Sequence, residues 1–105
     1  MSPGNGAGQG GATVDSMPVA VKRVKPIYPE EARRRGITGR VILRVQIDAA
    51  GNVREMLVQS AEPPGVFEVP AVEAMRKWRF KPALLVGKPA VSWLLLPIRF
   101  ALEDL

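Results

Sequence analysis

The chain contains no cysteine and no histidine. It therefore has no thiolate nucleophile, no imidazole base, and none of the side chains that usually hold zinc. Aromatic residues make up only 6% of the chain, and no apolar run reaches the ~18 residues that a membrane-spanning helix needs. These absences exclude thiol enzymes and histidine triads, and we expect this chain to be soluble. The lack of cysteine fits any cellular compartment.

Basic residues outnumber acidic ones. Lys plus Arg is 15 and Asp plus Glu is 10, which gives a net charge of +5. The basic residues are scattered, with small clusters at Arg33–Arg35 and Arg76–Lys81. A nucleic-acid partner is not expected, because the basic residues are scattered and are not gathered along one stripe.

The remaining groups that could catalyse a reaction lie on charged segments. Three carboxylate pairs are present: Glu30/Glu31, Glu68/Glu73 and Glu103/Asp104. None is flanked by the apolar residues that raise a carboxyl pKa for acid–base catalysis. Gly36 and Gly39 form neither a dinucleotide fingerprint nor a phosphate-binding loop. The sequence therefore predicts no enzyme activity, no cofactor and no metal site, and it leaves binding as the function.

Residues 1–17 and 18–105 differ in composition. The first part begins MSPGNGAGQGGATVDS, which is rich in glycine and poor in large apolar side chains. We expect it to be a disordered linker or an added tail. Residues 18–105 are predicted to form one domain. If the natural protein is exported or anchored, we expect the signal to lie upstream of this chain.

The segment that begins PIYPEEARRRG predicts a very short helix. Pro29 suits the first helical position. Glu30 and Glu31 lie near the positive end of the helix dipole and Arg33–Arg35 near the negative end. Gly36 is suited to the left-handed conformation that ends a helix.

A β-hairpin is predicted to follow. Apolar residues alternate with less apolar ones from Val41 to Ile47, as in a half-buried strand. Asp48–Gly51 has the composition of a turn. The return strand is expected over 53–61, and its alternation slips in a way that predicts a β-bulge near Arg54–Glu55.

A second helix and a last strand complete the prediction. An apolar stripe of Phe67, Ala71, Met75 and Trp78 predicts a helix that starts near Glu68. We expect its aromatic residues, together with Phe80 and Phe100, to lie in the core. The final stretch AVSWLLLPIRFAL predicts a strand, with Leu94, Leu96, Ile98, Phe100 and Leu102 on one face. The order helix, strand, strand, helix, strand predicts an α+β fold, with two helices on one face of a small three-stranded antiparallel sheet.

The last strand is predicted to lie at an edge of the sheet. Proline cannot donate to a β-ladder, so Pro97 indicates an edge position. An exposed edge strand with apolar residues on both faces can bind another chain as an added strand. The alternative is that Trp93 and Leu95 pack against the body of the domain or against a second copy of it.

Several landmarks along the chain resemble the C-terminal domain of TonB proteins. They are Tyr28-Pro29, Gly39-Arg40-Val41, the hairpin turn from Asp48 to Val53, Ser60-Ala61, MRKWRFKP, and Ile98 with Phe100, in that order. The resemblance covers about Val21 to Leu102. It implies a fold of the class predicted above.

The resemblance also implies a function. In the family, a protein anchored in the inner membrane works with ExbB and ExbD. Its periplasmic C-terminal domain binds the TonB box of outer-membrane receptors by strand addition. The energy comes from the proton gradient, and the cargoes are siderophore-bound iron, haem or cobalamin. The rival interpretation is a TolA-like domain or a TonB paralogue dedicated to one receptor, and a homodimer is possible.

The residues that the resemblance implies for partner binding form two segments. The family has QPxYP where this chain has KPIYP, so Lys25 replaces a glutamine and the preference for the box is expected to differ. The expected binding residues are Lys25, Pro26, Ile27, Tyr28, Pro29, Ser92, Trp93, Leu94, Leu95, Leu96, Pro97, Ile98, Arg99 and Phe100.

Overall fold

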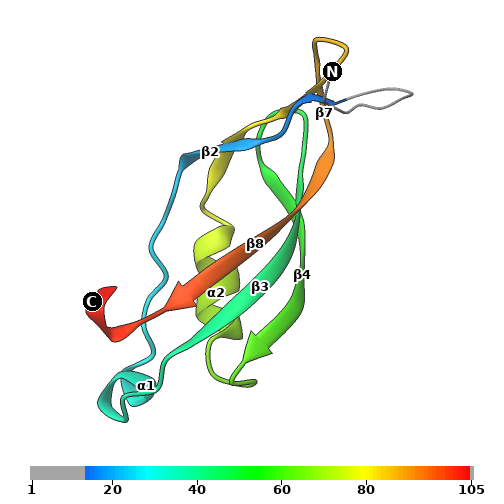
Figure 1. Cartoon of the computed structure of the whole chain (residues 1–105). Coiled ribbons are helices and arrows are strands. Elements are labelled where there is room, and N and C mark those ends of the chain that lie inside the picture. Colours follow the sequence, from blue (N-terminus) through cyan, green and yellow to red (C-terminus); the bar gives the residue numbers. More distant parts are fainter. Residues whose placement is uncertain (1–13, 105) are drawn as a thin grey trace, which may run out of the picture.

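A three-stranded antiparallel sheet forms the centre of the molecule in the computed structural model, which describes residues 14–104. Its strands are β3 (Gly39–Ile47), β4 (Val53–Glu62) and β8 (Ser92–Phe100). The order β4-β3-β8 places β3 in the middle and β8 at an edge (Figure 1). The predicted sheet and the edge position of its last strand are therefore confirmed.

The β3–β4 hairpin owes its shape to its turn and to two bulges. Gly51 has a φ of +88°, and its amide donates to the carbonyl of Asp48 at 3.0 Å. In the register, Gln46 lies opposite Glu55 and Ile47 opposite Val53, which leaves Arg54 as an extra residue. This confirms the predicted bulge. A second register shift, between Ser60 and Val58, was not predicted.

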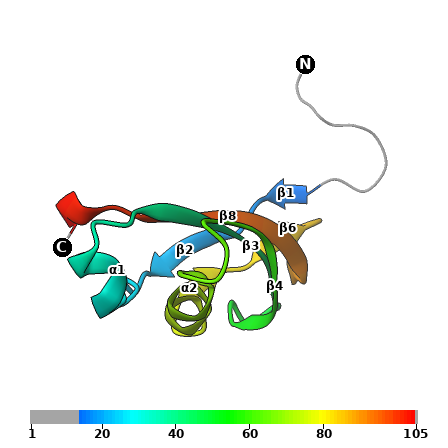
Figure 2. The same ribbon diagram turned by 90° about the horizontal axis from the view of Figure 1, so that it is seen from below.

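Two helices accompany the sheet, as predicted. Helix α1 (Glu30–Arg34) carries acidic residues in its first turn and basic ones in its last, and Gly36 follows it with a φ of +68°. Helix α2 (Glu68–Met75) contains Pro70 in its first turn, where the missing amide costs no helical hydrogen bond. In Figure 2 both helices lie on the same side of the sheet.

The core lies between α2 and the sheet. The inward residues of β3, from Val41 through Leu43 and Val45 to Ile47, are completely buried. Phe67, just before α2, stacks on Phe100 of β8 with ring centroids 4.3 Å apart. Burying a side chain of this size contributes about 1.5–3 kcal/mol, so the central strand and this aromatic pair hold the sheet to the helix.

Two residues lie elsewhere than predicted. Trp78 was expected in the core, and Leu102 was expected on the inward face of the last strand. Trp78 is only half-buried and packs at the margin of the core, beside Phe80. Its indole N–H needs an acceptor, which explains a position at the boundary. Leu102 does not continue β8, because the chain turns into the short 3₁₀ helix η1 (Leu102–Asp104), where Leu102 is exposed.

Five short strands were not predicted. They are β1 (Val14–Ser16), β2 (Val19–Lys22), β5 (Arg79–Lys81), β6 (Ala83–Leu85) and β7 (Lys88–Ala90). Strands β1, β6 and β7 form one small sheet, and β2 pairs with β5. The β6–β7 connection turns at Val86 and Gly87, and Pro89 belongs to β7. Strands of three or four residues are too short to show an alternating pattern in the sequence.

The tail was expected to extend to residue 17, and the structure places residues 14–16 of it in strand β1. Val14 lies opposite Leu85 and Ser16 opposite Leu84 in the β1–β6 pair. The Oδ2 atom of Asp15 also accepts a hydrogen bond from the amide of Gly87 at 2.6 Å. Pairing with a distant hairpin therefore orders residues whose own composition favours a linker. Residues 1–13 of the expected tail lie outside the described residues.

Candidate functional site: the edge strand and the segment beside it

Strand β8 has one paired side and one unpaired side. It runs antiparallel to β3 without a bulge, from Gly39 opposite Phe100 to Ile47 opposite Ser92. Within residues 14–104, no other strand pairs with it. Its outer backbone groups are therefore available to another chain.

Pro97 indicates which residues of β8 direct their backbone outward. Pro97 lies opposite Ile42. A proline directed toward β3 would leave a ladder acceptor without its donor, so we expect Pro97 to occupy an outward position. Backbone groups alternate in direction along a strand, so the amide of Leu95 points outward and that of Leu96 points toward β3.

The two faces of β8 have different surroundings. Ile98 and Phe100 are buried on the helix side, and Leu94 and Leu96 are half-buried there. On the other face Leu95 is 59% exposed and Trp93 is 37% exposed. The interpretation that both residues pack against the body of the domain is therefore wrong for Leu95, whereas Trp93 is partly covered by the sheet.

A basic side chain accompanies the aromatic residue on this uncovered face. The guanidinium carbon of Arg44, on β3, lies 4.9 Å from the centre of the Trp93 ring. Such a cation–π contact holds both side chains against the sheet. A strand added to the edge would therefore place alternate side chains beside a structured surface of Trp93, Leu95 and Arg44.

Tyr28 connects the second predicted segment to the end of β8. Its ring makes edge contacts with Phe67 and Phe100, with centroids 5.6 and 5.8 Å apart respectively. Its hydroxyl donates to the carbonyl of Ile37. Desolvation by these neighbours raises the pKa of Tyr28, so it stays a neutral donor at physiological pH.

Trp78 holds the same segment further upstream. Its indole N–H donates to the carbonyl of Val24 at 3.0 Å, and the guanidinium of Arg23 lies 5.6 Å from the ring centre. The chain between Val24 and Tyr28 is therefore attached at both ends, and Ile27 between them is 80% exposed.

The structure brings only part of the predicted site together. Tyr28 touches Phe100, the last residue of β8. Lys25 and Ile27 instead line a pocket of about 260 Å³ against α2, together with Pro70 and Glu73. Ser92 lies at the opposite end of β8 from Tyr28, and its hydroxyl has no hydrogen-bond partner in the described part of the chain.

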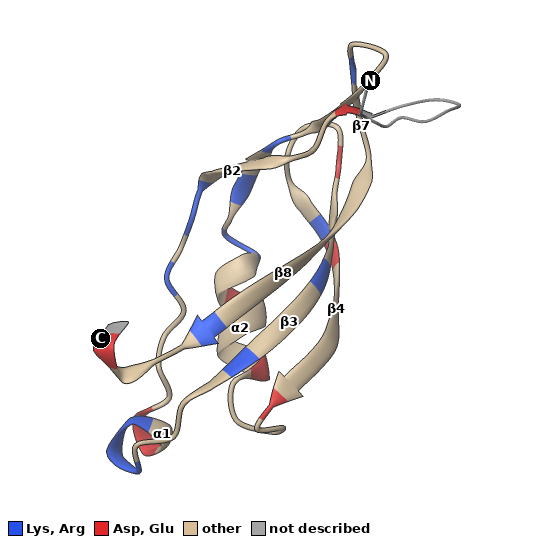
Figure 3. Ribbon diagram, in the orientation of Figure 1, with Lys and Arg blue, Asp and Glu red and all other residues tan. Residues whose placement is uncertain are grey.

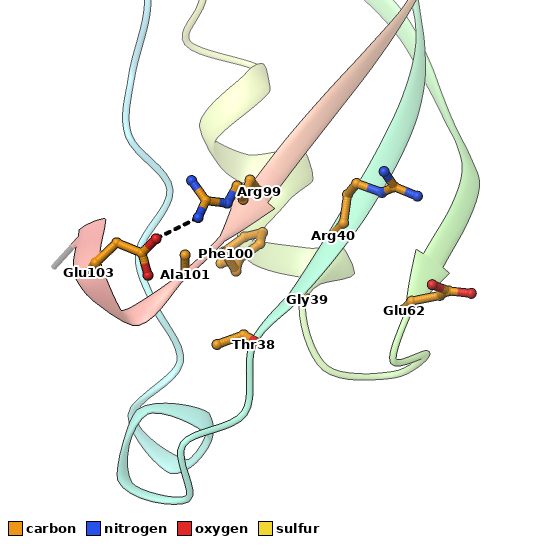
Figure 4. A pocket seen from close by; sticks show the side chains of 8 residues that line it. All are labelled: Thr38, Gly39, Arg40, Glu62, Arg99, Phe100, Ala101 and Glu103. Atoms are coloured by element: carbon orange, nitrogen blue, oxygen red, sulfur yellow. Dashed lines mark hydrogen bonds and ion pairs between the residues drawn. The ribbon is translucent and has the colours of Figure 1, made fainter.

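A second pocket lies where β3 begins and β8 ends. It has a volume of about 470 Å³ and is lined by Thr38, Gly39, Arg40, Glu62, Arg99, Phe100, Ala101 and Glu103 (Figure 4). Arg99 forms an ion pair with Glu103 at 2.6 Å. The pKa of Glu103 is lowered, first by a hydrogen bond from its own backbone amide and then by Arg99.

Sequence reasoning missed Arg40 and Glu62 in this pocket. Arg40 lies opposite Glu62 on one side and opposite Arg99 on the other. These three residues are neighbours because of the register of β4, β3 and β8, which no short stretch of sequence shows. Among residues 14–104 no group of three potential ligands could hold a metal ion. In the same range, no helix is long and apolar enough to cross a membrane.

Comparisons with known proteins agree on one family. The family model described as "Gram-negative bacterial TonB protein C-terminal" matches residues 24–102. The chain is 37% identical to Protein TonB of Vibrio cholerae over 90 residues, which are 86% of this chain and 37% of that protein. It is also 37% identical to Protein TonB of Xanthomonas campestris, over 89% of this chain and 41% of that protein. The chain thus spans well under half the length of these relatives.

A solved structure resembles the whole fold. The solution NMR structure of the Pseudomonas aeruginosa TonB C-terminal domain superimposes with a TM-score of 0.71. The two chains are 31% identical, and the match covers 85% of this chain and 90% of that one.

Proposed function

Because this chain belongs to the TonB C-terminal domain family, we propose that it binds a peptide as an added strand on the outer edge of β8. The partner is the TonB box, a short segment of outer-membrane receptors. The observation that carries the proposal is the unpaired side of β8 next to Pro97, in a sheet whose other edge is the twice-bulged strand β4. The domain acts by binding, without catalysis.

The segment from Lys25 to Pro29 contributes to one end of this site. Tyr28 packs on Phe100, so the segment meets β8 where the strand ends. A peptide that continues past Phe100 would contact Tyr28 and then Ile27, whose side chain is 80% exposed. Lys25 stands where the family has glutamine, which favours a receptor preference that differs from that of typical relatives.

The function of the whole protein extends the same proposal. The matched relatives are more than twice as long as this chain. We infer that the complete protein is anchored in the inner membrane and associates there with ExbB and ExbD. Its C-terminal domain lies in the periplasm and transmits energy from the proton gradient to receptors for siderophore-bound iron, haem or cobalamin.

The test is a titration of the domain with TonB-box peptides from several receptors, followed residue by residue by NMR. Shifts are expected along Ser92–Phe100 and Lys25–Pro29. Leu95→Pro removes an outward donor, which lowers the affinity about tenfold to a hundredfold through the loss of one or a few hydrogen bonds. Leu95→Ala is the matched control, and it is expected to weaken binding only slightly, because strand addition depends on the backbone.

A further variant tests which backbone amides of β8 point toward β3. Leu96→Pro removes a donor to β3, so it is expected to lower the stability of the fold, as measured by circular dichroism. If Leu95→Pro is folded and binds every box peptide like the wild type, the peptide does not add to β8. Pairing of β8 with a second copy of the chain would instead appear as a dimer in sedimentation experiments.

A further inference from the structure

The β2–β5 ladder has a buried face and a basic face. Ala20 lies opposite Phe80, which is buried in the core. On β5, Arg79 and Lys81 flank Phe80 and direct their side chains away from the core, with Val19 opposite Lys81. The register shifts between Ala20 and Lys22, and this irregularity places Lys22 opposite Arg79, with its side chain exposed. Three basic side chains therefore share the open face of a ladder of only two short strands.

Four more basic residues adjoin this face. Two come from the extended segment after β2 and two from the end of α2. We call the whole set the basic patch: Lys22, Arg23, Lys25, Arg76, Lys77, Arg79 and Lys81, all of them exposed. In Figure 3, basic segments in blue lie at the end of β2, along the extended segment after it and on the chain that follows α2.

The basic patch lacks the acidic partners that other basic residues have. On α1, Arg33 and Arg34 form ion pairs with Glu30 and Glu31. No member of the basic patch forms an ion pair with any residue of the described range. Acidic side chains of α2 adjoin one border of the patch: Glu73 lines a pocket with Lys25 and Lys77, and Glu68 and Glu73 line another with Arg76. Positive charge therefore accumulates chiefly on β2 and β5, where Lys22, Arg79 and Lys81 form no ion pair within the described residues.

Exposed aliphatic side chains surround the same charges. Val19 is 57% exposed and Val21 is 62% exposed on β2, and Met17 just before it is 54% exposed. Two aromatic rings adjoin the patch: Phe80 is buried, and Trp78 already contacts Val24 and Arg23, so neither is free to stack on a nucleic-acid base. Basic side chains beside exposed valines match the interface of an anionic bilayer, where the charges meet phosphates and the aliphatic groups reach the acyl boundary.

We propose that the basic patch binds the surface of a membrane that contains anionic phospholipid. This site barely overlaps the strand-adding site, because its residues lie on β2, on the extended segment that follows β2, after the end of α2 and on β5. Lys25 is the one residue that both sites share. The binding would hold the domain at a bilayer surface while β8 stays available to a peptide.

The experiment is co-sedimentation of the chain with vesicles of phosphatidylcholine mixed with phosphatidylglycerol, against vesicles of phosphatidylcholine alone. Binding is expected only to the anionic vesicles and is expected to weaken as salt is raised. The triple variant Lys22→Gln, Arg79→Gln and Lys81→Gln is expected to lose affinity for the anionic vesicles on the order of a hundredfold. The reason is that each of the three basic residues contributes about one favourable contact with an anionic headgroup.

The matched control removes the same charge elsewhere. Arg33→Gln, Arg34→Gln and Arg35→Gln on and next to α1 is expected to leave vesicle binding unchanged, and NMR spectra verify that both triple variants are folded. Absence of binding to the anionic vesicles overturns the proposal, as do equal losses in the two triple variants. Binding of poly-glutamate together with no binding of vesicles also overturns it and identifies an acidic protein as the partner. Neither result bears on the peptide titration, which tests β8.

Discussion

Trp78 and Tyr28 show how single side chains hold an extended segment in place. Each ring packs at the margin of the core, and each donates one hydrogen bond to a backbone carbonyl, Trp78 to Val24 and Tyr28 to Ile37. The segment between Val24 and Tyr28 forms no strand or helix. Its position therefore depends on these two side chains.

The contribution of the Trp78 hydrogen bond can be measured separately from its packing. Trp78→Phe keeps an aromatic ring but loses the donor to Val24, so we expect a loss of about 1 kcal/mol of stability. Trp78→Ala also removes the packing, and we expect about 3 kcal/mol. Thermal unfolding measures both, because 1 kcal/mol corresponds to roughly 4–8 °C in a domain of this size. Equal melting temperatures for wild type and Trp78→Phe would contradict the assigned hydrogen bond.

Asp48 makes the hairpin turn sensitive to pH. Its pKa is lowered, first by the hydrogen bond from the amide of Asn52 and also by Ala50 and Arg54. A carboxyl whose pKa is lower in the folded state stabilises the fold above its unfolded pKa. That stabilisation is lost as the pH falls through the folded value.

We therefore expect wild type to be more stable than Asp48→Asn at neutral pH, and the difference to vanish between about pH 5 and pH 2. The measurement is chemical denaturation of both proteins across that range. Two curves that stay parallel down to the acidic end would show that Asp48 titrates alike in the folded and unfolded chains.

At the scale of single elements, the start of β3 depends on a glycine that has no side chain to clash. A Cβ atom at Gly39 would collide with the carbonyl of Glu62 and would come within 2.8 Å of Phe67 Cε2. The strand therefore begins in contact with the end of β4 and with Phe67, the residue before α2. The motif Gly39-Arg40-Val41 thus has a steric reason.

Gly39→Ala is expected to destabilise the domain by about 2–3 kcal/mol, because the backbone of β4 or the ring of Phe67 must move. Gly87→Asn serves as its control. Gly87 has a φ of +74° with no atom within 4 Å of an added Cβ, and asparagine accepts that conformation, so the expected loss is below about 1 kcal/mol. Similar urea midpoints for the two variants would rule out the steric explanation.

On the scale of the whole molecule, stability is expected to differ between the two ends. The molecule measures 50 × 26 × 22 Å along its principal axes. The large core lies between α2 and the central sheet, and the small β1-β6-β7 sheet forms the other end (Figure 1). Short strands with little buried surface open more easily than a buried central strand.

Hydrogen exchange tests this difference directly. We expect the amides of Leu43 and Val45 in β3 to exchange at least about a hundredfold more slowly than those of Leu84 and Leu85 in β6. Asp15→Ala removes the acceptor of the Gly87 amide, so exchange at Gly87 should accelerate while β3 keeps its rates. Uniform protection along the chain would show one cooperative unit from end to end.

The sequence by itself determined the parts of the fold that depend on local chemistry. Alternating apolar residues in β3, the stripe of α2, the Asp48–Gly51 turn and the Arg54 bulge each lie within one short stretch of chain, so their patterns were readable. Pro97 predicted the edge position of β8, because this signal is also local and depends on a single residue. The binding roles of Lys25–Pro29 and Ser92–Phe100 stay a prediction.

Only the tertiary structure decided the features that join distant residues. Val14 belongs to a strand because Leu85 lies opposite it, and Trp78 is half-buried because the carbonyl of Val24 accepts its N–H. The basic patch exists because β2 pairs with β5 and brings Lys22 next to Arg79, which are far apart in the chain. Such contacts form when the chain closes long loops around a common core, and no local pattern of residues records which segments will then meet.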